Sequence, residues 1–419
     1  MLLSPRPEPA GAPARKVRRP IPPIPGLPPL CGLVCLDELP GTLGLTLFQR
    51  AADVALWSEC EPSQRLGLFR QGQPEHAYEA PSSVIPALAA LAHVVSQPEA
   101  ARPVYVSQAC TAISEWAQSA GHTGTALLFA ELAAAADPDN PVLAVAAGRV
   151  LLDAARYARA RRWFDRAERV AHLAADHQTR ADAFLALGVL EERRGKLRQA
   201  MRMMRRTFRL AKRHGLADIG GHAHQNAVAI CGQTHRFAEA QAHAEAAVTL
   251  YGPGHSHLPA LAQDISRLWC EQGYFDAALP VLEAALAAMT DPDQRYIVTA
   301  NLARAAAGVG DRDLFLRVWR ELEQLDAPAT RRFAADALVG LGEGAMMLGF
   351  AVAARDLAVK GLTVARDRGE SVTAAEAEDL IFRLPQGQPV APRKPPPDRE
   401  LLLAARLVRM LTEAAAPRC

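Results

Sequence analysis

The sequence predicts an all-α fold, a right-handed superhelical solenoid of about seven helix hairpins. Half of the 419 residues are hydrophobic and only 5% are aromatic, and Ala and Leu dominate the periodic segments. This composition favours helix over sheet. A small residue also recurs at intervals of 34 to 40 residues, often with a Gly five residues before it. Such a period is typical of helix pairs that bury their apolar faces only by stacking on neighbours.

The recurring residue is expected to lie on the packed face of the second helix of each pair. Its seven copies, called anchors below, are Ala126, Ala160, Ala200, Ala240, Ala278, Phe315 and Ala354. Because Gly adopts left-handed backbone conformations without steric cost, the turn within each pair is expected five residues earlier. These turn positions are Gly121, Ala155, Gly195, His235, Gly273, Gly310 and Gly349. Gly148, Gly188 and Gly342, each twelve residues before an anchor, indicate close contact between the two helices of a pair.

With these positions, residues 104–370 resemble the tetratricopeptide repeat family, in the long-repeat form found in bacterial regulators and scaffolds. The first interval between anchors, Ala126 to Ala160, equals the 34-residue period of that family. The resemblance implies a non-enzymatic scaffold or adaptor. It also implies that the first helix of each pair lines an inner groove that binds a protein or peptide.

The segments on either side of the array differ from it in composition. Residues 1–40 are rich in Pro and Arg, and we expect a disordered tail that lacks the apolar core of a secretory signal. Residues 41–100 are expected to form an irregular helical cap, with helices over 42–60 and 82–96 joined by a loop over 61–81.

At the other end, residues 371–397 are expected to hold a short helix and a Pro-rich linker. A last helix is expected over 398–416, with Asp398 as its N-cap. Its apolar stripe includes Leu403 and Leu407. We expect this helix to cover the open end of the last repeat, and the alternative is that it folds into the groove as a stand-in ligand.

The repeat register places a set of polar side chains on the expected inner wall. Asn and Gln offer both donors and acceptors for a peptide backbone, and the Arg guanidinium suits a carboxylate. Solvation of the groove is the plainer interpretation. The candidate groove residues are Arg149, Arg193, Gln225, Asn226, Gln233, Gln263, Arg267, Asn301 and Arg304.

Residues 141–220 contain 18 Lys and Arg but 8 Asp and Glu, a net charge of +10 in a chain of formal net charge +2. Many of these cations share one face of two expected second helices. A solvated face is the plain interpretation; an acidic protein, a membrane or a nucleic acid is the alternative partner. Few aromatics lie between them, so nucleic acid is the less favoured partner. This basic convex stripe consists of Arg159, Arg162, Arg166, Arg169, Arg198, Arg202, Arg205, Arg209 and Lys212.

The sequence shows no pattern that predicts catalysis, a cofactor or a metal site. Gly340, Gly342 and Gly344 lie in an expected helix without the Lys-Ser/Thr of a phosphate loop. The carboxylates of Glu191 and Glu192 point about 100° apart on a helix. Six histidines cluster along the chain: His222, His224, His235, His243, His255 and His257. The two His-X-His pairs among them are interpreted as polar loop residues at opposite ends of a hairpin rather than as metal ligands.

Taken together, these observations predict a cytoplasmic protein- or peptide-binding scaffold that acts through its concave groove. Seven scattered cysteines and the lack of a long apolar run support a reducing compartment without a membrane span. The alternatives are a regulator that senses a peptide by changing its curvature and a solenoid that binds a polyanion or nucleic acid through the arginines. The sequence leaves the partner and the oligomeric state open.

Overall fold

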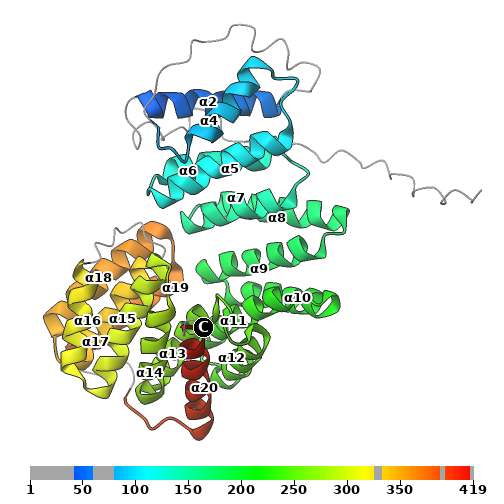
Figure 1. The fold of residues 1–419 in the computed structure, drawn as a ribbon. Helices are drawn as coiled ribbons and strands as arrows, with labels where there is room; N and C mark the ends of the chain where they lie inside the picture. The colour runs from blue at the N-terminus through cyan, green and yellow to red at the C-terminus, as the bar shows by residue number, and fades with distance from the viewer. Residues whose placement is uncertain (1–41, 60–79, 325–332, 387–391, 416–419) are drawn as a thin grey trace, which may run out of the picture.

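The structure, a computed structural model, describes residues 42–59, 80–324, 333–386 and 392–415. Within these ranges the chain forms 18 α-helices and one short 3-10 helix, and no β-strand. Figure 1 shows most of the helices stacked in pairs along a curved path. The predicted all-α array of stacked hairpins is therefore confirmed. The tail expected over residues 1–40 lies outside the described ranges.

Seven hairpins form the array, and in each the two helices pack directly on one another. We call the first helices the inner helices and the second helices the outer helices. The pairs are α5–α6 (Pro103–Ser119, Thr123–Ala136), α7–α8 (Pro141–Asp153, Tyr157–Ala174), α9–α10 (His177–Arg193, Leu197–His214), α11–α12 (Ala217–Gln233, Phe237–Tyr251), α13–α14 (Leu258–Gln272, Phe275–Ala288), α15–α16 (Pro292–Val309, Arg312–Gln324) and α17–α18 (Ala334–Met347, Ala351–Arg368).

The repeat register holds in all seven hairpins. Every anchor lies on an outer helix, and none is more than 1% exposed. Every expected turn position has a positive φ, from 54° at His235 to 90° at Gly310. Ala155, at 57°, shows that the turn geometry is kept even where Gly is replaced. A left-handed turn of this kind fixes the direction in which the outer helix returns over the inner one.

Close packing explains the Gly positions on the inner helices. A Cβ added at Gly148 would lie 2.4 Å from Cε1 of Phe164 on the outer helix. At Gly188 it would lie 2.4 Å from Cε of Met204. At Gly342 it would lie 3.1 Å from Cδ2 of Leu380 and 3.3 Å from the carbonyl oxygen of Ala354 on the outer helix. The second and third hairpins therefore bring the backbone of the inner helix against a large side chain of the outer helix, and the seventh brings two backbones close together.

Two further helices cover the N-terminal end of the array. These are α2 (Thr42–Glu59) and α4 (Ile85–Ser96), and they share a core cluster with α5 and α6. Trp57 is fully buried in that cluster, and its indole Nε1 donates to the carbonyl oxygen of Pro98 at 2.8 Å. Both helices agree with the sequence expectation, although α4 begins three residues later than expected and residues 60–79 are not described.

The last helix, α20 (Asp398–Ala415), takes neither of the two places expected for it. It packs on α14 and also contacts α13, far from the last hairpin in the chain (Figure 1). The expected place on α17–α18 is already filled by α19 (Ser371–Arg383), followed by η3 (Leu384–Gln386). Ala377 and Leu380 of α19 are buried there with Val339 and Ala358. The cap prediction for α20 is therefore wrong, because α19 already covers that apolar face.

Candidate binding cavity

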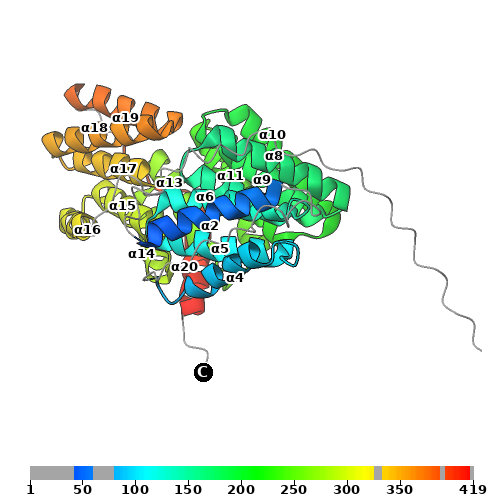
Figure 2. The same cartoon turned by 90° about the horizontal axis from the view of Figure 1, so that it is seen from above.

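A polar cavity of about 440 Å³ lies on the inner side of the array. Its wall is built by α7, α9, α11, α13 and α15, all inner helices, and by residues around α17 and α19. Figure 2, a view at right angles to Figure 1, shows α18 and α19 at one end of the molecule and α2 and α4 crossing the stack. The curvature of the array thus brings side chains from hairpins far apart in sequence to one space.

Seven of the nine candidate groove residues line this cavity. They are Arg149, Arg193, Gln225, Asn226, Gln233, Gln263 and Arg267. Asn301 and Arg304 do not, because α15 packs directly on α17 and turns these two positions into that contact. Both are about 5% exposed or less, and Nε of Arg304 lies 2.5 Å from Oε2 of Glu343 on α17. The expectation that Asn301 and Arg304 face the groove is corrected accordingly.

The three arginines of the cavity are already paired with carboxylates of the chain itself. Arg149 lies 2.6 Å from Asp182, and Arg267 lies 2.9 Å from Glu271. Arg193 lies 3.4 Å from Glu370 and 3.9 Å from Asp336. These guanidinium groups therefore hold the wall together, and a free carboxylate of a ligand would have to compete for them.

The wall as a whole is acidic. Six carboxylates line the cavity against three guanidinium groups: Asp153, Glu192, Asp264, Asp336, Glu370 and Glu376. Burial raises the pKa of Glu376 to about 8, while the nearby Arg267 acts in the opposite direction. A carboxyl with this pKa is largely protonated near neutral pH, so it can donate a hydrogen bond. If it loses its proton, the resulting carboxylate can pair with a cationic group of a ligand.

The amide side chains are oriented by hydrogen bonds to these carboxylates. Nε2 of Gln225 donates to Asp264 at 2.7 Å, and Nε2 of Gln233 donates to Glu192 at 2.6 Å. The hydroxyl of Tyr251 donates to Oε1 of Gln225 at 2.8 Å. Among the described residues that line the cavity, three buried atoms have no hydrogen-bond partner: Oε1 of Gln233, Nε2 of His222 and Oε2 of Glu370. Each unmet hydrogen bond favours a ligand that supplies it.

Sequence reasoning missed the part that α19 plays in this cavity. Glu370, Val372, Thr373 and Glu376 line it from a helix outside the seven repeats. The residues just before α19 bridge to the second and third hairpins. Nη2 of Arg368, at the end of α18, donates to the carbonyl oxygen of Asp153 at 3.0 Å, and Glu370 accepts from Arg193 at 3.4 Å. Figure 1 shows α19 next to α9. No repeat position signals this contact, because it depends on the curvature summed over five hairpins.

Only one of the two His-X-His pairs lies in a loop as expected, His255 and His257 before α13. His222 and His224 lie in α11, and the His222 ring is 4.2 Å from that of His257 at the start of the next hairpin. Nδ1 of His224 is 2.9 Å from Nδ1 of His243 on α12. Burial, with the adjacent histidines second, lowers the pKa of both His222 and His224 to about 4. No group of three or more metal-binding side chains occurs among the described residues.

The basic convex stripe is only partly free on the surface. All five of its cations on α10 are exposed on the outer wall: Arg198, Arg202, Arg205, Arg209 and Lys212. On α8, Arg162 and Arg169 are exposed, but Arg159 forms an ion pair with Glu131. Arg166 is 4% exposed and donates to the carbonyl oxygen of Pro138 at 3.1 Å. The interpretation of Arg166 as a surface residue is wrong, because α6 and the turn after it cover this side of α8.

No family model and no curated protein matches the chain. Solved structures do match. One is the crystal structure of the APC/C hetero-tetramer Cut9–Hcn1, with 14% identity, 85% of this chain and 57% of that chain covered, and a TM-score of 0.48. Another is the TPR domain of P58(IPK), with 14% identity, 87% of this chain and 100% of that chain covered, and a TM-score of 0.22. In the described part of the chain, no helix has the length and apolar character needed to cross a membrane.

Proposed function

We propose that this tetratricopeptide-like array is a non-enzymatic scaffold that binds a short peptide segment of another protein in its inner cavity. The observation that carries the proposal is the set of three buried, unsatisfied atoms on the cavity wall: Oε1 of Gln233, Nε2 of His222 and Oε2 of Glu370. A ligand with well-placed hydrogen bonds would satisfy them. Because the wall is preformed by packed helices, binding would cost little ordering of the protein.

The charge of the wall indicates which peptide fits. Six carboxyl groups, of which Glu376 is largely protonated near neutral pH, face three arginines that are already paired within the chain. A segment with Lys or Arg side chains and free amide donors therefore complements the cavity better than an acidic one. This reverses the sequence expectation that the groove arginines would bind a carboxylate.

A phage-displayed heptapeptide library selected on the full chain tests this proposal. We expect enrichment of basic peptides, and we expect their synthetic versions to bind at least about tenfold more weakly to Ala229→Trp, since Ala229 lines the cavity. Ala158→Trp, at an exposed position of α8, is the matched control and should bind normally. Equal binding to the wild type and to Ala229→Trp would contradict the proposal.

The contact between the start of α19 and the third hairpin favours a second candidate function, a sensor in which ligand binding changes the curvature of the array. Glu370 bridges Arg193 of the third hairpin and Arg368 of the seventh, at 3.4 and 2.9 Å. A ligand that competes for these ion pairs would open the array. Small-angle X-ray scattering should then show a larger radius of gyration for the chain with a selected peptide than for the chain alone. An unchanged radius would contradict the sensor and favour the scaffold function.

A further inference from the structure

The array carries a built-in example of an amphipathic helix bound to its outer wall. Helix α20 packs on α14, contacts α13 and reaches α12, where Nε and Nη2 of Arg399 donate to Glu245 at 2.6 and 2.8 Å. Its buried side chains join the main core cluster and are Leu403, Ala404, Leu407, Met410 and Leu411. The outer wall between two successive outer helices, with an inner helix beneath, is thus a surface that accepts such a helix.

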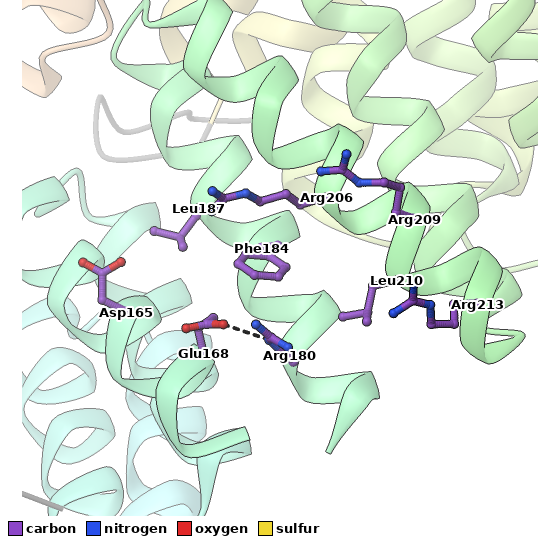
Figure 3. Close-up of a pocket in the computed structure, with 9 residues that line it drawn as sticks. All are labelled: Asp165, Glu168, Arg180, Phe184, Leu187, Arg206, Arg209, Leu210 and Arg213. Carbon is purple, nitrogen blue, oxygen red and sulfur yellow. Dashed lines mark hydrogen bonds and ion pairs between the residues drawn. The ribbon is translucent and has the colours of Figure 1, made fainter. Parts of the chain in front are cut away.

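The same arrangement of three helices occurs two hairpins earlier, where α8, α9 and α10 correspond to α12, α13 and α14. There the surface is hollow. Figure 3 shows the larger hollow, of about 470 Å³, with Phe184 of α9 between side chains of α8 and α10. A second hollow of about 350 Å³ adjoins it and shares Leu187 and Arg206. Together these two hollows are called the α8–α10 groove.

The α8–α10 groove combines an apolar floor with a cationic rim. Phe184, Leu187, Met203 and Leu210 form the apolar part. The guanidinium carbons of Arg180 and Arg206 lie 5.5 and 5.6 Å from the centre of the Phe184 ring. An apolar floor of this kind favours a partner that also brings apolar side chains, which a nucleic-acid backbone does not.

Charge along the rim is unbalanced. Its three carboxylates are all paired with arginines from α8 and α9, since Arg161 is shared by Asp165 and Glu191, and Arg180 pairs with Glu168 at 2.8 Å. Four arginines of α10 line the groove without an ion pair among the described residues: Arg202, Arg206, Arg209 and Arg213. These four stay available for anionic groups of a partner.

We propose that the α8–α10 groove binds an acidic amphipathic helix of another protein. Its apolar side chains would cover the floor at helical spacing, as those of α20 do on α14, and its carboxylates would pair with the four free arginines. The α20 site shows the same charge matching with the signs reversed, because Arg399 and Arg393 of the C-terminal segment face Glu245 and Asp276. A second copy of α20 is a poor occupant, since its three acidic and three basic residues leave it without net charge.

The probe is a fluorescent 18-residue peptide with Leu at positions i, i+3, i+4 and i+7 of successive turns and Glu on the opposite face. Fluorescence anisotropy with the full chain should show saturable binding. The double variant Arg206→Glu and Arg209→Glu should weaken it at least about tenfold, because two attractive contacts become repulsive. Arg355→Glu with Lys360→Glu, an equal charge change at exposed positions of α18, is the control and should change affinity by less than about twofold.

Three further measurements decide between this partner and a general polyanion. A scrambled peptide of the same composition, a 20-base-pair DNA duplex and heparin are compared with the probe. We expect the amphipathic peptide to bind most tightly, and Leu210→Ser to weaken that peptide but not heparin. Equal binding of the scrambled peptide, tighter binding of the duplex, or no effect of Leu210→Ser would each overturn the proposal. Binding should survive in Ala229→Trp, which separates this surface from the inner cavity.

Discussion

Replacement of Gly148 by Ala tests the helix packing on which the whole array rests. An added Cβ would lie 2.4 Å from Cε1, 2.6 Å from Cδ1 and 2.9 Å from Cζ of Phe164. Real Cβ atoms do not approach a ring this closely, and Phe164 is 0% exposed, so its ring has no free space to move into. The outer helix α8 must therefore shift away from α7.

The expected change in stability is the sum of two opposing effects. Overpacking of a core costs about 1–3 kcal/mol. Ala in place of Gly in a helix stabilises by about 0.5–1 kcal/mol, because Gly loses more backbone freedom on folding. The Gly148→Ala variant should therefore lose between about 0 and 2.5 kcal/mol, with a midpoint of about 1 kcal/mol.

Gly220→Ala is the matched control, since it lies in α11 and an added Cβ would meet Leu250 at 3.6 Å and Ala211 at 3.7 Å. These are ordinary contact distances, so no overpacking is expected. The higher helix propensity of Ala over Gly should therefore stabilise the folded chain by about 0.5–1 kcal/mol. Thermal unfolding followed by circular dichroism measures both variants. Gly148→Ala should be less stable than Gly220→Ala, and a Gly148→Ala variant stabilised as much as Gly220→Ala would refute the packing described for α7 and α8.

Three other predictions concern single positions. Ala160→Arg should prevent stable folding of its hairpin, because Ala160 is 0% exposed and a buried, unpaired guanidinium is costly; a soluble variant with wild-type melting temperature would contradict this. Leu407→Ala should release α20 by removing about 2–5 kcal/mol of packing, and amide hydrogen exchange should then rise in α20 but not in α7–α10. On acidification, the unfolded chain takes up protons at His222 and His224 near pH 6.5 while the folded chain does so only near pH 4. Stability should therefore fall as pH drops from about 6.5 to 4, by about 1–2 kcal/mol for each histidine after allowance for solvent screening, and His224→Phe should flatten the profile of melting temperature against pH.

Local sequence signals predicted the hairpins well because each hairpin is defined within about 40 residues. The anchors and turn positions needed only the spacing of small residues, and even His235 and Ala155 took the expected left-handed turn. The inner wall was harder. Asn301 and Arg304 were projected inward from the regular register, but α15 packs directly on α17 and buries them.

Features that depend on the curvature of the whole array could not be predicted from local spacing. Glu370 meets Arg193 although the two residues are 177 positions apart in the chain. The place of α20 on α14 likewise depends on where the segment before α20 ends. The leucine stripe of α20 indicated only that this helix packs on some apolar surface. The pairing of the cavity arginines follows from the same long-range contacts, so the acidic character of the wall was not evident in the sequence.

The contact of Arg193 with Glu370, together with that of Arg368 with Asp153, has a consequence for how the molecule comes apart. In an open row of repeats each unit touches only its neighbours, and unfolding starts at a free end and moves inward. Here the second and third hairpins contact residues at the end of the last hairpin. The hairpins from the second to the seventh therefore form a closed set of contacts rather than an open row. Because none of these hairpins is a free end, they should unfold together in one transition. Helices α2 and α4 and the first hairpin lie outside this closed set and should unfold separately.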